Sequence, residues 1–124
     1  MGLSEELEKL GRIFIDTAPI IYHIEAHLLF GPMMRKIVGI LEARNIEALS
    51  SVVTITEVLP KPVKAGRRDL VEKFVSFLRY SRSLELIDIS AGIAEKAGAE
   101  AFMTNDRKLK QIQELKIICL KDYA

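Results

Sequence analysis

The chain has almost no thiol chemistry available to it. Its single cysteine, Cys119, cannot form a disulfide within the chain. Small secreted domains held together by disulfides are therefore excluded as a class, and the composition fits a reducing cytoplasm, which is the location we expect. Cys119 also lies in an apolar segment, so we expect it to be buried and not to act as a nucleophile.

Long hydrophobic segments and an excess of one charge are missing as well. No apolar run is long enough to span a bilayer, so we expect no membrane partner. Residues 1–7 lack the basic stretch and apolar core of a signal peptide. Lys and Arg total 18 and Asp and Glu total 17, so the net charge is +1. The overall charge therefore argues neither for nor against nucleic acid as a partner.

The apolar content is sufficient for one hydrophobic core. The chain has 124 residues, of which 49% are hydrophobic, and this favours a single domain over residues 1–124. Residues 1–10 are expected to form a short helical extension at the N-terminus. Ser4 would cap this helix, Glu5 and Glu6 would form its acidic first turn, and Gly11 would close it.

Short apolar runs alternate with segments of helical periodicity. We expect strands at residues 12–16, 48–53, 84–88, 101–104 and 116–120. Helices are expected at residues 19–28, 32–41, 54–59, 67–82 and 107–112, with a further short helix capped by Ser90. Residues 60–68 contain two prolines and are expected to form a loop within the domain. Strands that alternate with helices predict an α/β fold with a parallel sheet flanked by helices.

Three acidic residues each follow an apolar strand and precede a helix. They are Asp16, Glu57 and Asp106. The carboxyl ends of parallel strands meet at one crevice, where ligands bind in such folds. Carboxylates gathered there can hold a hard divalent cation. The three acids therefore predict a metal-dependent hydrolase of phosphate esters.

Each acid also has a purely structural explanation. Thr54 and Glu57 have the spacing of a capping box, and Asp16 and Asp106 can each cap a helix. Caps need only a short polar side chain, however, and Thr17 and Asn105 are adjacent to the two aspartates. Three neighbouring carboxylates also repel one another unless a cation joins them. Taken together, these points weaken the explanation by three separate caps and leave a shared metal site as an open alternative.

Other candidate groups carry weaker signals. His23 and His27 are spaced four residues apart, which predicts a partly exposed pair on one helix face more than a zinc site. Met33 and Met34 are expected to fill the core. A basic cluster lies in and after the proline-containing segment, where it is either solvated or in contact with RNA phosphates. Its members are Lys61, Lys64, Arg67 and Arg68.

At these residues the chain resembles the PIN-domain family, and within it the ribonuclease toxins of toxin–antitoxin pairs. Residues 13–17 with Ile21 and Tyr22 are similar to the first family motif. Residues 54–60 are similar to the second motif, and residues 102–109 to the last. The resemblance runs in order from Arg12 to the C-terminus, and three motifs in sequence are fairly specific.

The resemblance implies a three-layer fold with a five-stranded parallel sheet in the order 3-2-1-4-5. It also implies a Mg²⁺- or Mn²⁺-dependent endoribonuclease that hydrolyses RNA phosphodiester bonds. On this basis Asp16, Glu57 and Asp106 would hold the metal and carry catalysis. Thr104 would orient the site with its hydroxyl, supported by Thr17 and Asn105. The implied partners are the RNA substrate, an antitoxin protein that covers the crevice, and a second copy in a homodimer.

The chain departs from the family in one respect. Family members carry a further acid at the start of a helix before the fourth strand, and no such acid lies between Ala97 and Ala101. Asp88, Glu95 and Glu100 are poor replacements, and Glu100 precedes its strand at the wrong end. Two interpretations remain open. The chain is either a ribonuclease, with activity impaired by the missing acid, or a non-catalytic module that binds RNA or a protein partner.

The same departure shortens a connection. Only residues 89–99 join the third strand to the fourth. If the strand order holds, these strands lie three positions apart, or roughly 14 Å at about 4.8 Å per strand. A crossover needs about 10–12 residues. We therefore expect a strained or poorly ordered region here, or a rearranged sheet edge.

Overall fold

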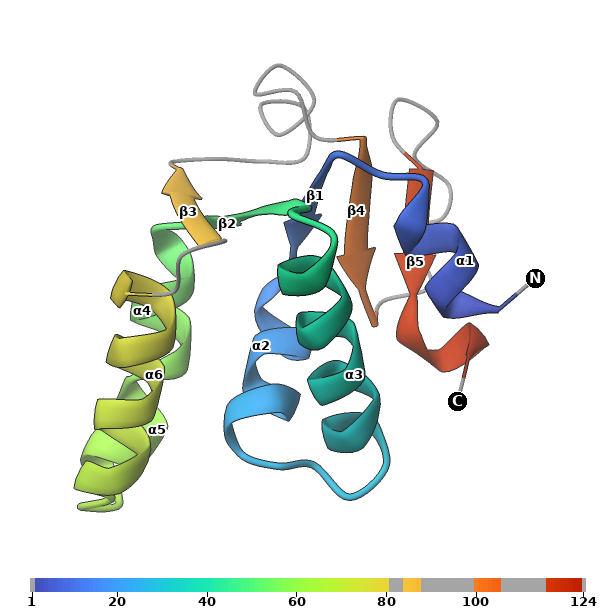
Figure 1. Ribbon diagram of the computed structural model, residues 1–124. Coiled ribbons are helices and arrows are strands. Elements are labelled where there is room, and N and C mark those ends of the chain that lie inside the picture. Colours follow the sequence, from blue (N-terminus) through green and yellow to red (C-terminus); the bar gives the residue numbers. More distant parts are fainter. Residues whose placement is uncertain (1, 81–83, 88–99, 106–115, 124) are drawn as a thin grey trace.

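The computed structural model describes residues 2–80, 84–87, 100–105 and 116–123. Within these residues, five strands form one parallel sheet in the order β3-β2-β1-β4-β5 (Figure 1). The strands are β1 (Arg12–Ile15), β2 (Glu47–Ser51), β3 (Leu84–Ile87), β4 (Ala101–Thr104) and β5 (Lys116–Cys119). The predicted α/β class, parallel pairing and strand order are all confirmed.

β1 occupies the centre of the sheet because its side chains are apolar on both faces. Ile13, Phe14 and Ile15 are all buried. Phe14 pairs with Leu49 of β2 on one side and Phe102 of β4 on the other. A short strand that is apolar throughout is typical of the middle of a parallel sheet covered by helices. The residue that follows β1 therefore lies at the centre of the sheet's carboxyl edge.

Six α-helices are described, and they flank the sheet in three groups (Figure 1). α2 (Thr17–Ile24) and α3 (Phe30–Ala43) lie side by side below the middle of the sheet. α4 (Val53–Val58), α5 (Pro60–Lys64) and α6 (Arg68–Tyr80) gather on the β3 side. α1 (Leu3–Glu8) lies beside β5, where Lys116 forms an ion pair with Glu6, and a 3₁₀ turn, η2 (Leu120–Asp122), follows β5.

All three groups contribute to a single core. Fully buried side chains come from the central strand and from the helices that cover it. The helical members include Leu7, Ile20, Met34, Ile37, Leu41, Phe74 and Leu78. Met34 is completely buried and Met33 packs against the core, as predicted for both methionines. Cys119 is likewise buried and is a free thiol, which confirms its predicted environment.

The N-terminal helix forms where it was expected, but its predicted ends are wrong. α1 begins at Leu3, so Ser4 lies inside the helix, and the residue at the cap position is Gly2 without a side-chain hydrogen bond. The helix ends at Glu8, three residues before Gly11. This short helix has no side-chain cap, and it is stabilised instead by the burial of Leu7 in the core and by the ion pair of Glu6.

The break between α2 and α3 is earlier than predicted. α2 begins at Thr17 and ends at Ile24, and Ala26 adopts a positive φ of 53°. Leu28, expected on the apolar face of the first helix, is 98% exposed. Gly31 and Pro32 do not break a helix, because they lie in the first turn of α3, where proline needs no N–H partner.

The region after β2 also differs from the prediction in detail. β2 ends at Ser51, and α4 begins at Val53, so Thr54 lies inside the helix and the capping box is wrong. Ser51 Oγ instead accepts a hydrogen bond from the Val53 N–H at 3.1 Å. The expected loop at residues 60–68 is largely the short helix α5, because both prolines fall in its first turn.

Three expectations fall outside the described residues. They are the helix capped by Ser90, the helix at residues 107–112, and the strained connection at residues 89–99. β3 and β4 do lie three positions apart in the sheet, as assumed for that connection.

Candidate functional site at the carboxyl edge of the sheet

Asp16 lies where the sequence predicts it, directly after the central strand. Its backbone N–H donates to the Met103 carbonyl at 2.8 Å, which extends the β1–β4 ladder by one bond. Its backbone is extended, and it occupies the cap position of α2. Its Oδ1 accepts from the backbone N–H of Thr17 at 2.9 Å. The carboxylate is thus held at the junction of strand and helix and is only partly buried.

Thr104 fixes the other oxygen of the same carboxylate. Its hydroxyl donates to Asp16 Oδ2 at 2.9 Å, and its side chain is completely buried. Thr104 ends β4, so this contact joins the carboxyl ends of two neighbouring strands. Each carboxylate oxygen accepts more than one hydrogen bond or metal bond, so the two donors orient Asp16 without exhausting its acceptor capacity.

A chain of three hydroxyls lies behind Asp16. Thr17 Oγ1 and Thr54 Oγ1 are 3.1 Å apart, and Thr54 Oγ1 lies 3.4 Å from Ser50 Oγ. Ser50 Oγ donates to the Ile15 carbonyl at 2.9 Å. Ser50 and Thr54 are buried, and neither was singled out from the sequence as part of the site. A hydroxyl at the second position of α4 offered no sequence signal beyond the capping pattern.

Glu57 is exposed on α4, three residues after Thr54 and so on the same side of that helix. α4 contacts both α2 and β2, so Glu57 is carried by an element packed beside the carboxyl edge. Asp106 lies outside the described residues. Within the described part of the chain, no group of three or more His, Cys, Asp and Glu side chains is placed to hold a metal ion.

Asn105 follows β4 and is almost completely buried. Its Nδ2 donates to the Tyr22 hydroxyl at 3.1 Å, and its Oδ1 accepts from the Lys121 N–H at 2.9 Å. The Cys119 thiol lies 3.8 Å from the same oxygen. Asn105 thus ties the end of β4 to α2 on one side and to the end of β5 on the other.

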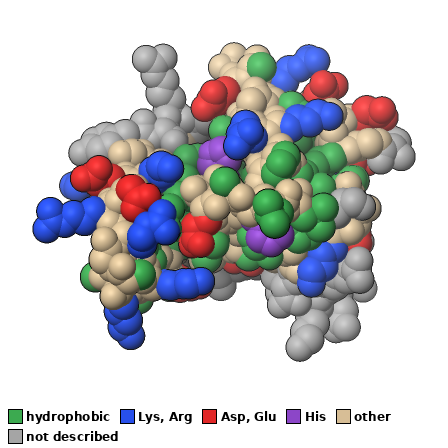
Figure 2. Space-filling model, turned by 90° about the horizontal axis from the view of Figure 1, so that it is seen from below, with side chains coloured by type: hydrophobic (Ala, Val, Ile, Leu, Met, Phe, Trp, Pro, Cys, Tyr) green, Lys and Arg blue, Asp and Glu red, His purple; other side chains and the backbone are tan. Residues whose placement is uncertain are grey.

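The basic cluster lies on α5 and at the start of α6, and all four of its side chains are exposed. Arg67 forms an ion pair with Asp69, with Nη2 and Oδ2 2.8 Å apart, and its hydrogen bond lowers the pKa of Asp69 to about 2. Figure 2 shows Lys and Arg side chains interspersed with Asp and Glu on this side of the molecule. The cluster is therefore partly neutralised by neighbouring acids.

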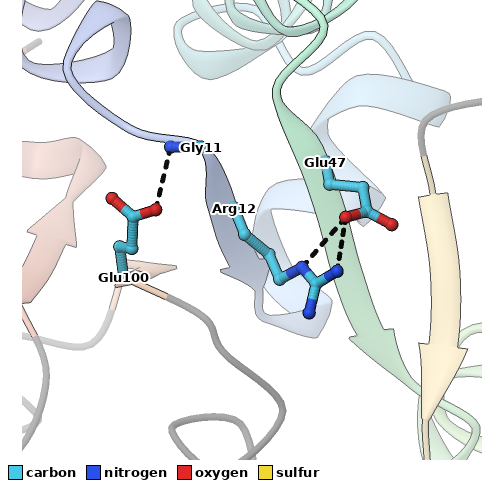
Figure 3. Close-up of polar contacts among 4 residues, drawn as sticks. All are labelled: Gly11, Arg12, Glu47 and Glu100. Atoms are coloured by element: carbon cyan, nitrogen blue, oxygen red, sulfur yellow. Dashed lines mark hydrogen bonds and ion pairs between the residues drawn. The ribbon is translucent and has the colours of Figure 1, made fainter.

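The acids at the opposite, amino edge of the sheet are engaged in structural contacts. Glu100 Oε1 accepts from the Gly11 N–H at 3.1 Å, and Glu47 Oε2 accepts from Arg12 at 3.0 Å and 2.6 Å (Figure 3). Glu100 precedes β4, so it lies a full strand length from Asp16. This placement confirms the prediction that Glu100 lies at the amino end of its strand, away from Asp16. Asp88 and Glu95 lie outside the described residues.

The two histidines do not share a helix face, so that prediction is wrong. His23 lies in α2, whereas His27 follows the end of that helix. His27 Nδ1 accepts from the backbone N–H groups of Leu29 and Phe30, at 3.2 Å and 3.1 Å, at the start of α3. His23 packs against Phe77 of α6 with ring centroids 5.1 Å apart. The His27 imidazole therefore accepts hydrogen bonds at the start of α3, whereas the His23 imidazole packs against an aromatic ring of α6.

Comparisons with known proteins support the fold. No protein-family model and no curated protein matches the chain significantly. Among solved structures, the chain is similar to a chain in the crystal structure of VapBC2 from Rickettsia felis bound to a DNA fragment from their promoter. The TM-score is 0.63 at 20% identity, and the match covers 87% of this chain and 98% of that chain. No helix in the described part of the chain is long and apolar enough to cross a membrane. At this level of identity, the likeness establishes a shared fold.

Proposed function

We propose that the protein is a metal-dependent endoribonuclease of the PIN toxin type. The observation that carries the proposal is the placement of Asp16. Its carboxylate lies at the carboxyl edge of the central strand and is oriented by the Thr17 N–H and the Thr104 hydroxyl, both at 2.9 Å. Ligand sites of parallel α/β folds lie at this edge. The resemblance of three ordered motifs and the fold shared with a VapBC2 chain support the same proposal.

The residues offered for a metal are carboxylates, which suit Mg²⁺ or Mn²⁺. Asp16 and Glu57 would hold the ion together with Asp106. Such an ion, when bound, lowers the pKa of a bound water and offsets charge on an attacked phosphate. The Thr104 hydroxyl orients one oxygen of the Asp16 carboxylate by a hydrogen bond, and the Thr17 N–H orients the other. Lys61, Lys64, Arg67 and Arg68 would contact RNA phosphates outside the crevice.

The proposed partners follow from the same resemblance. An antitoxin protein would cover the crevice and silence the enzyme, and two copies of the chain would form a homodimer. The proposed location is the cytoplasm, where such a protein would encounter an RNA substrate and its antitoxin.

A single-turnover cleavage assay with labelled RNA and Mn²⁺ tests the enzymatic proposal. We expect cleavage by the wild type and a loss of at least about a hundredfold in Asp16→Asn, because metal-bound carboxylates contribute several kcal/mol to such reactions. Asn at this position keeps the shape and can still accept from Thr17. Equal cleavage by wild type and variant would point to a contaminating nuclease and contradict the proposal.

A non-catalytic module that binds RNA or a protein is the second candidate. It is favoured by the further family acid that is absent between Ala97 and Ala101. Calorimetric titration with Mn²⁺ separates the two candidates. A dissociation constant below about 1 mM supports the enzyme, and weaker binding without any RNA cleavage supports the module.

A further inference from the structure

We infer that Thr54 is a positioning residue of the proposed metal site, and that its hydroxyl sets the placement of both Asp16 and Glu57. The inference rests on the proposed function and deepens it. Thr54 is 2% exposed and lies in α4, so it does not itself reach solvent or substrate. Its effect would pass through the hydroxyls on either side of it.

The direction of the hydroxyl chain follows from counting hydrogens. Ser50 has one hydroxyl hydrogen and donates it to the Ile15 carbonyl. Ser50 must therefore accept in its contact with Thr54, so Thr54 donates to Ser50. Thr54 has then used its own hydrogen and accepts from Thr17. The three hydrogen bonds therefore run in one direction, from Thr17 to Thr54, from Thr54 to Ser50, and from Ser50 to the Ile15 carbonyl of β1.

This chain holds the backbone on both sides of Asp16. The Ile15 carbonyl, one residue before Asp16, receives the Ser50 hydroxyl. The Thr17 side chain, one residue after Asp16, is held by Thr54, while the Thr17 N–H binds the Asp16 carboxylate. Loss of the Thr54 hydroxyl frees the first turn of α2 to rotate, and the Asp16 carboxylate rotates with it.

The same hydroxyl places Glu57. Thr54 and Glu57 are one turn apart on α4, which has only six residues and no side-chain cap at its start. The bond between Thr17 and Thr54 joins the first turn of α2 to the first turn of α4, so it fixes the distance between the helices that carry the two acids. A six-residue helix has little stability of its own and depends on such contacts for its position.

The test compares Mn²⁺ affinity in four proteins, measured by calorimetry at a temperature where all are folded. Thr54→Val keeps the shape and removes the hydroxyl, and Thr54→Ser restores the hydroxyl. Thr56→Val is the matched control, because Thr56 lies on the same helix, is exposed, and donates only to the Val53 carbonyl at 2.7 Å. Removing a direct partner of a metal ligand typically weakens metal binding by about 10–100-fold, and because Thr54 acts one bond further out, we expect an effect at the lower end of this range.

We expect Thr54→Val to bind Mn²⁺ at least about tenfold more weakly than the wild type, with Thr54→Ser and Thr56→Val within about threefold of it. A purely structural role would lower the melting temperature of Thr54→Val and leave its Mn²⁺ affinity unchanged, and that result overturns the inference. A wild type that binds no Mn²⁺ rejects the proposed function, and the inference with it. If Thr54→Val does not fold, Thr17→Val removes the same bond from the other side and carries the same expectation.

Discussion

The contacts of Asn105 predict that its side chain stabilises the carboxyl edge of the sheet. The change to test is Asn105→Ala, which removes the side chain that joins β4 to Tyr22 of α2 and to Lys121 after β5. Asn105 is 7% exposed, so water does not readily replace the lost contacts. Alanine leaves the Lys121 N–H and the Tyr22 hydroxyl without this partner.

The expected cost can be estimated from these contacts. A hydrogen bond contributes about 0.5–1.5 kcal/mol net, and a partner left unsatisfied in a buried position costs about 1–3 kcal/mol. Two bonds in a partly buried setting therefore give a loss of about 2 kcal/mol. With an unfolding entropy of about 2.1 cal/mol/K per residue, this corresponds to a fall of about 8 °C in Tm for a chain of this length.

Urea unfolding followed by circular dichroism measures this loss, and Tyr22→Phe completes a double-mutant cycle. Tyr22→Phe should cost about 1 kcal/mol in the wild type and much less in the Asn105→Ala background, because the bond is already gone. A loss below about 0.5 kcal/mol in Asn105→Ala, or full additivity of the two changes, would refute the role assigned to Asn105.

Two further predictions concern the helices that flank the sheet. Burial, followed by the neighbouring Arg35, lowers the pKa of His23 from its usual 6.5, while Glu42 partly opposes the shift. The unfolded state therefore binds the proton more readily, so the stability that neutral His23 contributes should be complete above about pH 6.5 and decrease below it. His23→Phe should flatten the pH dependence of the free energy of unfolding, measured with urea, between pH 5 and 7. An unchanged pH dependence would contradict the assignment. Gly31→Ala should destabilise the protein, because its new methyl group would lie 2.9 Å from the Ala26 backbone. In the same helix, the methyl group of Gly39→Ala would meet nothing within 4 Å, so this variant should be more stable than the wild type by about 0.5–1 kcal/mol in thermal melts. Equal Tm values for the two variants would argue against this packing.

The apolar runs predicted where the strands lie and that they are parallel, whereas their order was predicted only by the resemblance of three motifs to a known family. Ile13, Phe14 and Ile15 predicted a buried strand, and their burial in the structure agrees with its central position. Asp16 could be placed relative to its strand, since a residue after a parallel strand lies at the carboxyl edge, whereas the prediction for Asp106 falls outside the described residues. The resemblance predicted that the Thr104 hydroxyl orients the site, but local sequence patterns could not identify Asp16 as its partner, because the contact joins residues 88 positions apart.

The helix ends were predicted less well, and for identifiable reasons. Gly31 and Pro32 usually signal a break, but in a first turn they are tolerated. The actual break depends on Ala26 with a positive φ and on His27 as an acceptor for two N–H groups, and neither residue type is typical of that role. Ser50 and Thr54 were missed because a buried hydroxyl has the same sequence signature whether it caps a helix or joins two elements.

The contacts at the amino edge have a consequence for how length variation is tolerated. The Glu100 carboxylate binds the Gly11 N–H, and the Glu100 N–H binds the Arg12 carbonyl at 2.9 Å. Figure 3 shows the first of these bonds, and together they set the alignment of β4 against β1 from the residue that precedes β4. The pairing register is thus independent of how many residues connect Ile87 to Glu100. Insertions in that connection would change mainly the entropy of loop closure, which grows slowly with length. A longer connection is therefore compatible with the same sheet.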